Sequence, residues 1–157
     1  VSIRGDARSY ALLSRAFLAA GETPKAATAA EKAKKANPYS ARAHLALARV
    51  SAQKKNHSPA LQHCQRALKL DPFLVDAVAL KGTVLLRSGK PEKAARAWQK
   101  ALELDKWNAT LHWRLAELLR TTLDRPEKAV PHYRRVAELG GPRQKKAADM
   151  ADKLDNK

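Results

Sequence analysis

Apolar residues recur along the chain at the spacing of helices, and turn residues interrupt them at regular intervals. The apolar set is mainly Ala and Leu, with 5% aromatic residues and no long β-branched run, which favours close-packed helices over sheets. Helical segments close at Asn37-Pro38, Asp71-Pro72 and Asp105-Lys106, which lie 34 residues apart. The pattern therefore predicts one compact, all-α body made of a repeated helical unit.

Small residues and prolines coincide when the chain is divided at this period. Small side chains stand where two helices must approach closely, at Ser14, Ala48, Gly82 and Ala116, and again at Ala26, Ala60, Ala94 and Ala129. Prolines stand in the first turn of each second helix, where no hydrogen bond is lost, at Pro24, Pro59, Pro91 and Pro126. We therefore expect four helical hairpins, at 7–40, 41–74, 75–108 and 109–141.

The two ends of the chain differ from the repeats. Residues 142–157 place apolar side chains on one side and charged ones on the other, so we expect a capping helix that covers the last repeat. The segment 1–6 is too short to cap the first repeat, and we expect it to be the remnant of a longer protein. The fourth repeat has an extra turn residue, and Pro131 lies early in its second helix, which predicts a local distortion.

The third repeat carries the most distinctive residues of the pattern, which are Gly82, Leu85, Ala94, Trp98 and the closing segment 101–105. On these residues and on the period, the chain resembles the tetratricopeptide repeat family over about 135 of its 157 residues. The resemblance implies hairpins stacked into a right-handed superhelical solenoid of about nine helices. It also implies that the first helices line a concave groove that holds a partner.

Residues capable of catalysis or metal binding do not form a recognisable motif. His44 and His112 occupy the fourth position of their repeats, where the family has a residue packed inside the hairpin. No second cluster completes a metal site around His57, His63 and Cys64. The sequence has no Gly-rich phosphate loop and no Ser-His-Asp arrangement. We therefore predict no enzymatic activity, no cofactor and no metal site.

The chain is strongly basic. It has 31 Lys and Arg against 15 Asp and Glu, which gives a net charge of +16 and a pI near 10.3. This charge favours an anionic partner, although exposed Lys can also serve solubility alone. Arg is concentrated in the first helices and Lys in the second helices and connections. Because the planar guanidinium suits bidentate contacts with carboxylates, this partition indicates recognition of an acidic segment.

The resemblance places one set of side chains in the predicted groove. These are Arg8, Leu12 and Arg15 in the first repeat; Arg42, Arg49 and Gln53 in the second; Asp76, Thr83 and Arg87 in the third; and Trp113, Arg114, Glu117 and Arg120 in the fourth. Arg8 with Arg42, and Arg15 with Arg49, are one repeat apart and should form two short ladders. Trp113 is expected to anchor the partner, and Trp107 is expected to plug a junction between repeats.

The leading hypothesis is a non-catalytic scaffold or adaptor that binds an acidic peptide or partner protein in this groove, within a larger, bacterial assembly. A chaperone-tail adaptor is not predicted, because Ala11, Arg15 and Ala46 replace the Lys and Asn of the family's dicarboxylate clamp. One alternative is nonspecific nucleic-acid binding through phosphates, although the sequence lacks evident aromatic stacking platforms. Contact with an anionic membrane and a homodimer through the repeat ends also stay open.

Sequence features that bear on location are few. No apolar stretch approaches the roughly 20 residues that span a bilayer. A single cysteine, Cys64, rules out an intrachain disulfide and fits a reducing compartment. We therefore expect the cytoplasm or another soluble compartment.

Overall fold

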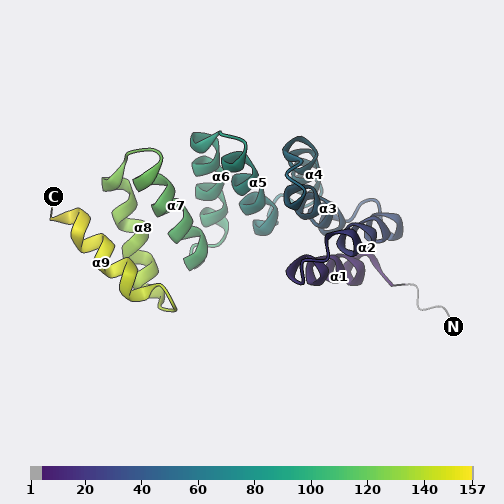
Figure 1. Cartoon of the computed structure of the whole chain (residues 1–157), viewed down its shortest axis with the longest axis horizontal. Helices are drawn as coiled ribbons and strands as arrows, with labels where there is room; N and C mark the ends of the chain where they lie inside the picture. Colours follow the sequence, from purple (N-terminus) through teal and green to yellow (C-terminus); the bar gives the residue numbers. More distant parts are fainter. Residues whose placement is uncertain (1–4, 157) are drawn as a thin grey trace. The chain divides into compact units, whose positions relative to one another are not determined.

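The computed structural model describes residues 5–156, which form nine α-helices and no strand (Figure 1). The helices are α1 (Ala7–Ala19), α2 (Thr23–Ala36), α3 (Ala41–Gln53), α4 (His57–Leu70), α5 (Val75–Arg87), α6 (Pro91–Leu104), α7 (Ala109–Thr121), α8 (Pro126–Leu139) and α9 (Gln144–Asp155). The prediction of an all-α fold is confirmed. Residues 1–4 of the expected N-terminal remnant, and Lys157, lie outside the described part. None of the described helices is long and apolar enough to cross a membrane.

The helices belong to two compact units, whose boundary falls between Ser88 and Gly89. The first unit contains α1 to α5, and the second contains α6 to α9. The expectation of a single compact body is therefore wrong. The boundary falls inside the predicted third hairpin, 75–108, because α5 belongs to the first unit and α6 to the second. The predicted groove residues consequently fall into two sets, one in each unit.

Side-chain caps and prolines start the helices. Ser40 accepts a hydrogen bond from the backbone N–H of Ala43 at 3.2 Å, and Asn108 accepts one from that of Leu111 at 3.1 Å. These N–H groups have no partner inside their own helices, so the caps satisfy them. The second helices α2, α6 and α8 instead carry a proline in the first turn. These two devices fix where α2, α3, α6, α7 and α8 begin.

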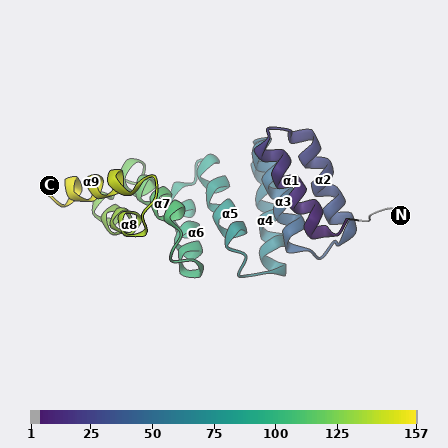
Figure 2. The ribbon, with the colours of Figure 1, turned by 90° about the horizontal axis from the view of Figure 1, so that it is seen from below.

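Close alanine packing joins the paired helices of the first unit. Figures 1 and 2 both show α1 beside α2, and α3 beside α4. Where α1 approaches α2, Ser14 is fully buried, and its hydroxyl donates to the backbone carbonyl of Ala26 at 2.8 Å. Ala26 and Ala30 pack with Leu47 and Val50 of α3 in one buried cluster. The small residues therefore let neighbouring helices share a core.

The second unit ends in α9, which packs against α8. Ala147 and Ala151 of α9 are buried in this contact. Helix α8 runs from Pro126 to Leu139 although Pro131 lies inside it. The fourth-repeat turn, with its extra residue, places Asp124 at a positive φ of 50°. The apolar side of α9 is thus buried against the unit.

Each turn between paired helices contains one residue with a positive φ, and in the second repeat this residue is Lys55, with φ at 61°. A left-handed conformation costs a residue with a side chain about 1 kcal/mol, whereas glycine adopts it readily. We expect Lys55→Gly to raise the free energy of unfolding by about 0.5–1 kcal/mol in urea denaturation followed by circular dichroism. The control is Lys54→Gly, at φ −75°, which should destabilise. Equal effects of the two changes would contradict the prediction.

Candidate functional site

A pocket of about 460 Å³ opens in the first unit, and we call it the arginine pocket. It is lined by residues of α1, α3, the α4–α5 turn and α5: Arg8, Ala11, Leu12, Arg15, Arg42, Leu45, Arg49, Asp71, Phe73, Leu74, Val75 and Asp76. The structure therefore brings together most of the groove residues predicted in the first two repeats, with Asp76 from the third. Gln53, Thr83 and Arg87 do not line this pocket.

Two arginines on each of two helices line the pocket. Arg8 and Arg15 are seven residues apart on α1, and Arg42 and Arg49 are seven apart on α3. This spacing is close to two helical turns, so each pair lies on one face of its helix. Four guanidinium groups against two carboxylates make the pocket positive.

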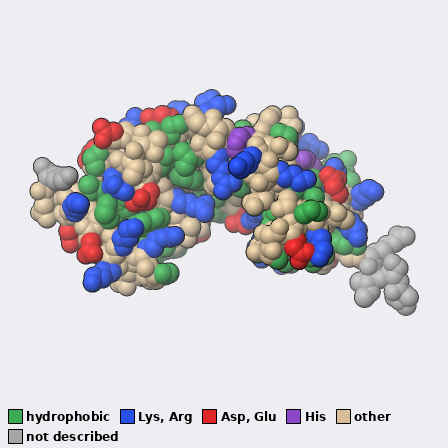
Figure 3. Space-filling view, in the orientation of Figure 1, with side chains coloured by type: hydrophobic (Ala, Val, Ile, Leu, Met, Phe, Trp, Pro, Cys, Tyr) green, Lys and Arg blue, Asp and Glu red, His purple; other side chains and the backbone are tan. Residues whose placement is uncertain are grey.

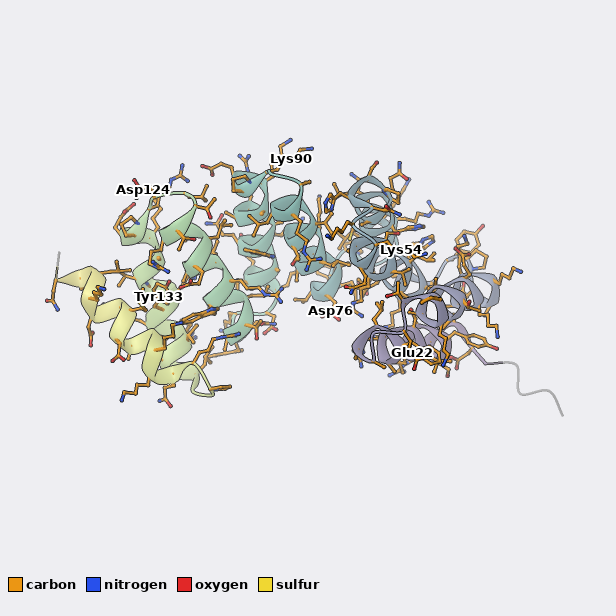
Figure 4. All side chains as sticks on the ribbon, viewed as in Figure 1. Glu22, Lys54, Asp76, Lys90, Asp124 and Tyr133 are labelled. Atoms are coloured by element: carbon orange, nitrogen blue, oxygen red, sulfur yellow. The ribbon has the colours of Figure 1, made fainter. Side chains whose placement is uncertain are left out.

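The two acidic side chains of the pocket already have partners. Arg49 donates to the Asp76 carboxylate with 2.6 Å between Nη2 and Oδ2, and Figure 4 labels Asp76 at the start of α5. Asp71 Oδ1 accepts a hydrogen bond from the backbone N–H of Phe73 at 3.1 Å. Within residues 5–156, Arg8, Arg15 and Arg42 take part in no ion pair. Their charges are available to an anionic ligand.

Phe73 is a pocket residue that the sequence analysis missed. Its side chain is 76% exposed, although it lines the arginine pocket. The turn that holds it recurs: the backbone N–H groups of Tyr39 and Trp107 donate to Asn37 and Asp105 in the same way. The repeated Asn or Asp, followed two residues later by an aromatic, is the signal that could have found Phe73.

Trp107 does not plug a junction, so that expectation is wrong. Its side chain is 57% exposed. Two cations lie over the ring, with Arg135 Cζ 4.3 Å and Lys106 Nζ 5.1 Å from the ring centroid. Trp107 lies in the same type of turn as Tyr39 and Phe73, which are also exposed. Turn geometry therefore outweighs the apolar character of the indole.

The predicted residues of the fourth repeat lie in the second unit, where Trp113 is half-buried. Its ring meets the edge of Tyr133, with centroids 5.5 Å apart and planes at 70°. Arg143 and Lys146 each place a cationic group 5.4 Å from the Trp113 centroid. A partner reaching this ring would have to compete with two cations from the α8–α9 connection and α9. The neighbouring Arg114 is exposed.

Glu117 and Arg120 are engaged with each other and with Tyr133, which Figure 4 labels on α8. Arg120 donates to the Tyr133 hydroxyl at 3.0 Å and to Glu117 Oε2 at 3.1 Å, and Tyr133 donates to Glu117. Burial, with a contribution from the hydrogen bond to Glu117, raises the pKa of Tyr133 to about 12. The hydrogen bond to Tyr133 raises the pKa of Arg120. The three groups connect α7 to α8.

Two histidine pairs join first and second helices in the same way. The Nδ1 atoms of His44 and His63 lie 3.4 Å apart, and those of His112 and His132 lie 2.9 Å apart. The Nε2 atoms of His44 and His112 each lie 3.1 Å from a backbone carbonyl oxygen, of Pro38 and Lys106 respectively. A carbonyl can only accept, so each Nε2 carries the proton and each neutral partner donates from its own Nδ1.

Burial lowers the pKa of three of these imidazoles. The pKa of His63 is lowered mainly by burial and then by the charges of His44 and Lys34, whereas Glu31 raises it. The pKa of His132 falls to about 4 through burial and the charge of His112. For His112 burial again lowers the pKa, and the Lys106 carbonyl opposes it. His44 and His112 were expected to pack inside their hairpins, but their partners His63 and His132 were not predicted.

Cys64 is not placed as a reactive thiol. Cys64 is fully buried, and burial raises the pKa of its thiol to about 11. A thiol in this state stays protonated and acts as a small apolar side chain. No cluster of three or more His, Cys, Asp or Glu suited to a metal ion occurs in the part of the chain that the structure describes.

Known proteins resemble this chain in sequence over part of their length. A family model described as the tetratricopeptide repeat matches residues 12–74 and 80–144. The human protein O-mannosyl-transferase TMTC3 is 34% identical over 91 residues, which are 57% of this chain and 10% of the human protein. The chain therefore spans only about a tenth of that relative.

Two solved structures share the fold. MamA from Desulfovibrio magneticus RS-1 is 25% identical with a TM-score of 0.72, and the match covers 85% of this chain and 75% of that one. YrrB, described as a TPR protein with an unusual peptide-binding site, is 22% identical with a TM-score of 0.69. The YrrB match covers 96% of this chain and 77% of that one. At these identities the likeness concerns the arrangement of helices.

Proposed function

Because this chain belongs to the tetratricopeptide repeat family, we propose that it is a non-catalytic scaffold that holds another protein by an acidic segment in the arginine pocket. One observation carries the proposal: four arginines line one pocket, and only Arg49 has an ion-pair partner within the described residues. YrrB, which shares the fold, has a peptide-binding site, and this supports the same use of the fold here.

Four arginines in one pocket favour binding of a carboxylate ligand over a role in solubility alone. Each guanidinium presents a planar set of donors that can bind a carboxylate through two hydrogen bonds. The pocket holds Arg8, Arg15 and Arg42 on two helices, so that several carboxylates could be bound at once. Figure 3 shows Lys and Arg spread over the visible face with Asp and Glu among them, so charge would also attract an acidic partner from a distance.

A second candidate function is binding of single-stranded nucleic acid. The sequence analysis found no stacking platform, but Tyr39, Phe73 and Trp107 are 73%, 76% and 57% exposed in equivalent turns. Exposed aromatics beside cations can stack on bases, and the net charge of +16 would attract phosphates. The pocket favours the acidic segment, because its arginines surround one concavity in which carboxylates can be bound by paired hydrogen bonds.

The test of the proposed function is binding of a fluorescent Glu-rich peptide at about 150 mM salt, measured by anisotropy. We expect the double variant Arg15→Glu, Arg42→Glu to weaken binding at least about tenfold, because two charge-assisted contacts become repulsive. The control is Arg66→Glu, Lys69→Glu, which changes the net charge equally on exposed positions of α4. Circular dichroism checks folding.

Equal loss in both double variants would show that net charge alone attracts the peptide, and the arginine pocket would be rejected as the site. A labelled single-stranded oligonucleotide is titrated in parallel. If the oligonucleotide binds at this salt and the peptide does not, the nucleic-acid function replaces the proposed one.

A further inference from the structure

Leu12 and Phe73 are the two exposed large apolar side chains that line the arginine pocket, and we call them the apolar shelf. The two side chains are 47% and 76% exposed, and both line the pocket. Single exposed apolar residues are common on protein surfaces. Here two of them share one concavity with four guanidinium groups, and the turn at Asp71 holds the backbone of Phe73.

The position of Leu12 on α1 sets the order of contacts along a ligand. Leu12 follows Arg8 by four residues and precedes Arg15 by three, so the three side chains lie along one face of the helix. A ligand running beside α1 would meet a cation, an apolar side chain and a second cation in turn. Leu12 would thus contact the part of the ligand between two carboxylates.

The size of the pocket favours an extended ligand. A volume of about 460 Å³ is that of a site for a small molecule or a few side chains. A helix with its side chains is about 10–12 Å across, so only one face of a helix could contact a pocket of this volume. In an extended strand, alternate side chains face the same way, so every second residue could contact the pocket.

We infer that the acidic segment is extended and carries an apolar side chain between two carboxylates, in the pattern Glu-x-Leu-x-Glu, with the apolar group packed on Leu12 and Phe73. The inference rests on the proposed function, since it specifies the ligand of the same pocket. The carboxylates bind Arg8, Arg15 and Arg42, which have no ion pairs within residues 5–156 of their own chain. Charge selects the acidic segment, and the shelf selects among acidic segments.

Two fluorescent peptides of equal charge test this, one with the pattern Glu-x-Leu-x-Glu and one with Ser in place of Leu. On the wild-type chain the Leu peptide is expected to bind about tenfold more tightly, as burial of one aliphatic side chain implies. Phe73→Ser should remove most of this preference, measured as the ratio of the dissociation constants of the two peptides on the same variant. Because Phe73 is 76% exposed, the substitution leaves the core intact.

Tyr39→Ser is the matched control, since Tyr39 is 73% exposed in the equivalent turn but does not line the arginine pocket. It should leave the preference for Leu unchanged. If the two peptides bind wild type equally and the arginine double variant still weakens both, the shelf inference is overturned and the proposed function stands. If neither peptide binds wild type, the proposed function fails, and the inference fails with it.

Discussion

Lowering the pH from about 7.5 to about 5 should destabilise the second unit by about 2 kcal/mol, through His132 above all. Burial and the charge of His112 hold the pKa of His132 at about 4, below the ordinary 6.5 of the unfolded chain. Below pH 6.5 the unfolded chain therefore binds a proton that the folded chain does not. Stability is full above that pH and falls as the pH drops toward the folded pKa.

The geometry of the pair explains why acid opposes the folded state. In the neutral pair, one Nδ1–H donates to the other Nδ1 across 2.9 Å. When both rings are charged, both Nδ1 atoms carry protons and the hydrogen bond is lost. His63 and His112 also have lowered pKa values, so both hairpins should lose stability in the same direction. Lys34 and Glu31 act on the pKa of His63, and Arg135 and Asp105 act on that of His112.

Tryptophan fluorescence can report the second unit separately, because all three tryptophans, Trp98, Trp107 and Trp113, follow Ser88. Urea denaturation is followed by fluorescence at several pH values between about 7.5 and 5, above the ordinary range of carboxylate titration. His132→Gln should remove most of the dependence on pH. His57→Gln is the control, since His57 belongs to neither pair. An unchanged slope in His132→Gln would disprove the role of the pair.

The sequence predicted the helices well because helical periodicity and turn residues are local signals. Alanines such as Ala26 and Ala60 recur at one period and are fully buried, so the repeat could be recognised without tertiary information. The division between Ser88 and Gly89 lies inside the third repeat and was not predicted. The periodic pattern treats α5 and α6 as one hairpin and reports no tertiary contacts.

The candidate site was predictable only in part. The family pattern grouped Arg8, Arg15, Arg42 and Arg49, and these four side chains line one pocket, because side chains one repeat apart on stacked helices lie near each other. It could not show that Asp76 holds Arg49, since that ion pair depends on the approach of α5 to α3. Phe73 was missed because the groove pattern considers helices, whereas the pocket also uses a turn.

Replacement of Tyr133 should have the largest effect on stability of any single change considered for this chain. Tyr133 is completely buried in α8, and its hydroxyl contacts both Arg120 and Glu117. Tyr133→Ala removes the ring from a packed interior and leaves a cavity, for which about 3–5 kcal/mol is expected. The edge contact with Trp113 would be lost as well.

Tyr133→Phe separates packing from hydrogen bonding. It keeps the ring but removes the hydroxyl, while Arg120 and Glu117 still bind each other at 3.1 Å. The expected loss is therefore only about 1 kcal/mol. Tryptophan fluorescence during urea denaturation measures both variants. The control, Tyr39→Ala, replaces an exposed tyrosine of the first unit; it is followed by circular dichroism and should stay within about 0.5 kcal/mol of wild type.

The relative size of the stability losses in Tyr133→Phe and Tyr133→Ala shows what the hydrogen bonds among Tyr133, Glu117 and Arg120, here called the Tyr133 network, contribute. If Tyr133→Phe costs as much as Tyr133→Ala, the hydrogen bonds to Glu117 and Arg120 join α7 to α8, and packing of the ring adds little. If Tyr133→Ala costs no more than Tyr39→Ala, the ring is not part of a close-packed core. The expected result, a large loss for Ala and a small one for Phe, means that ring packing stabilises the hairpin. The network then mainly holds Glu117 and Arg120 in place, which limits their availability to a partner.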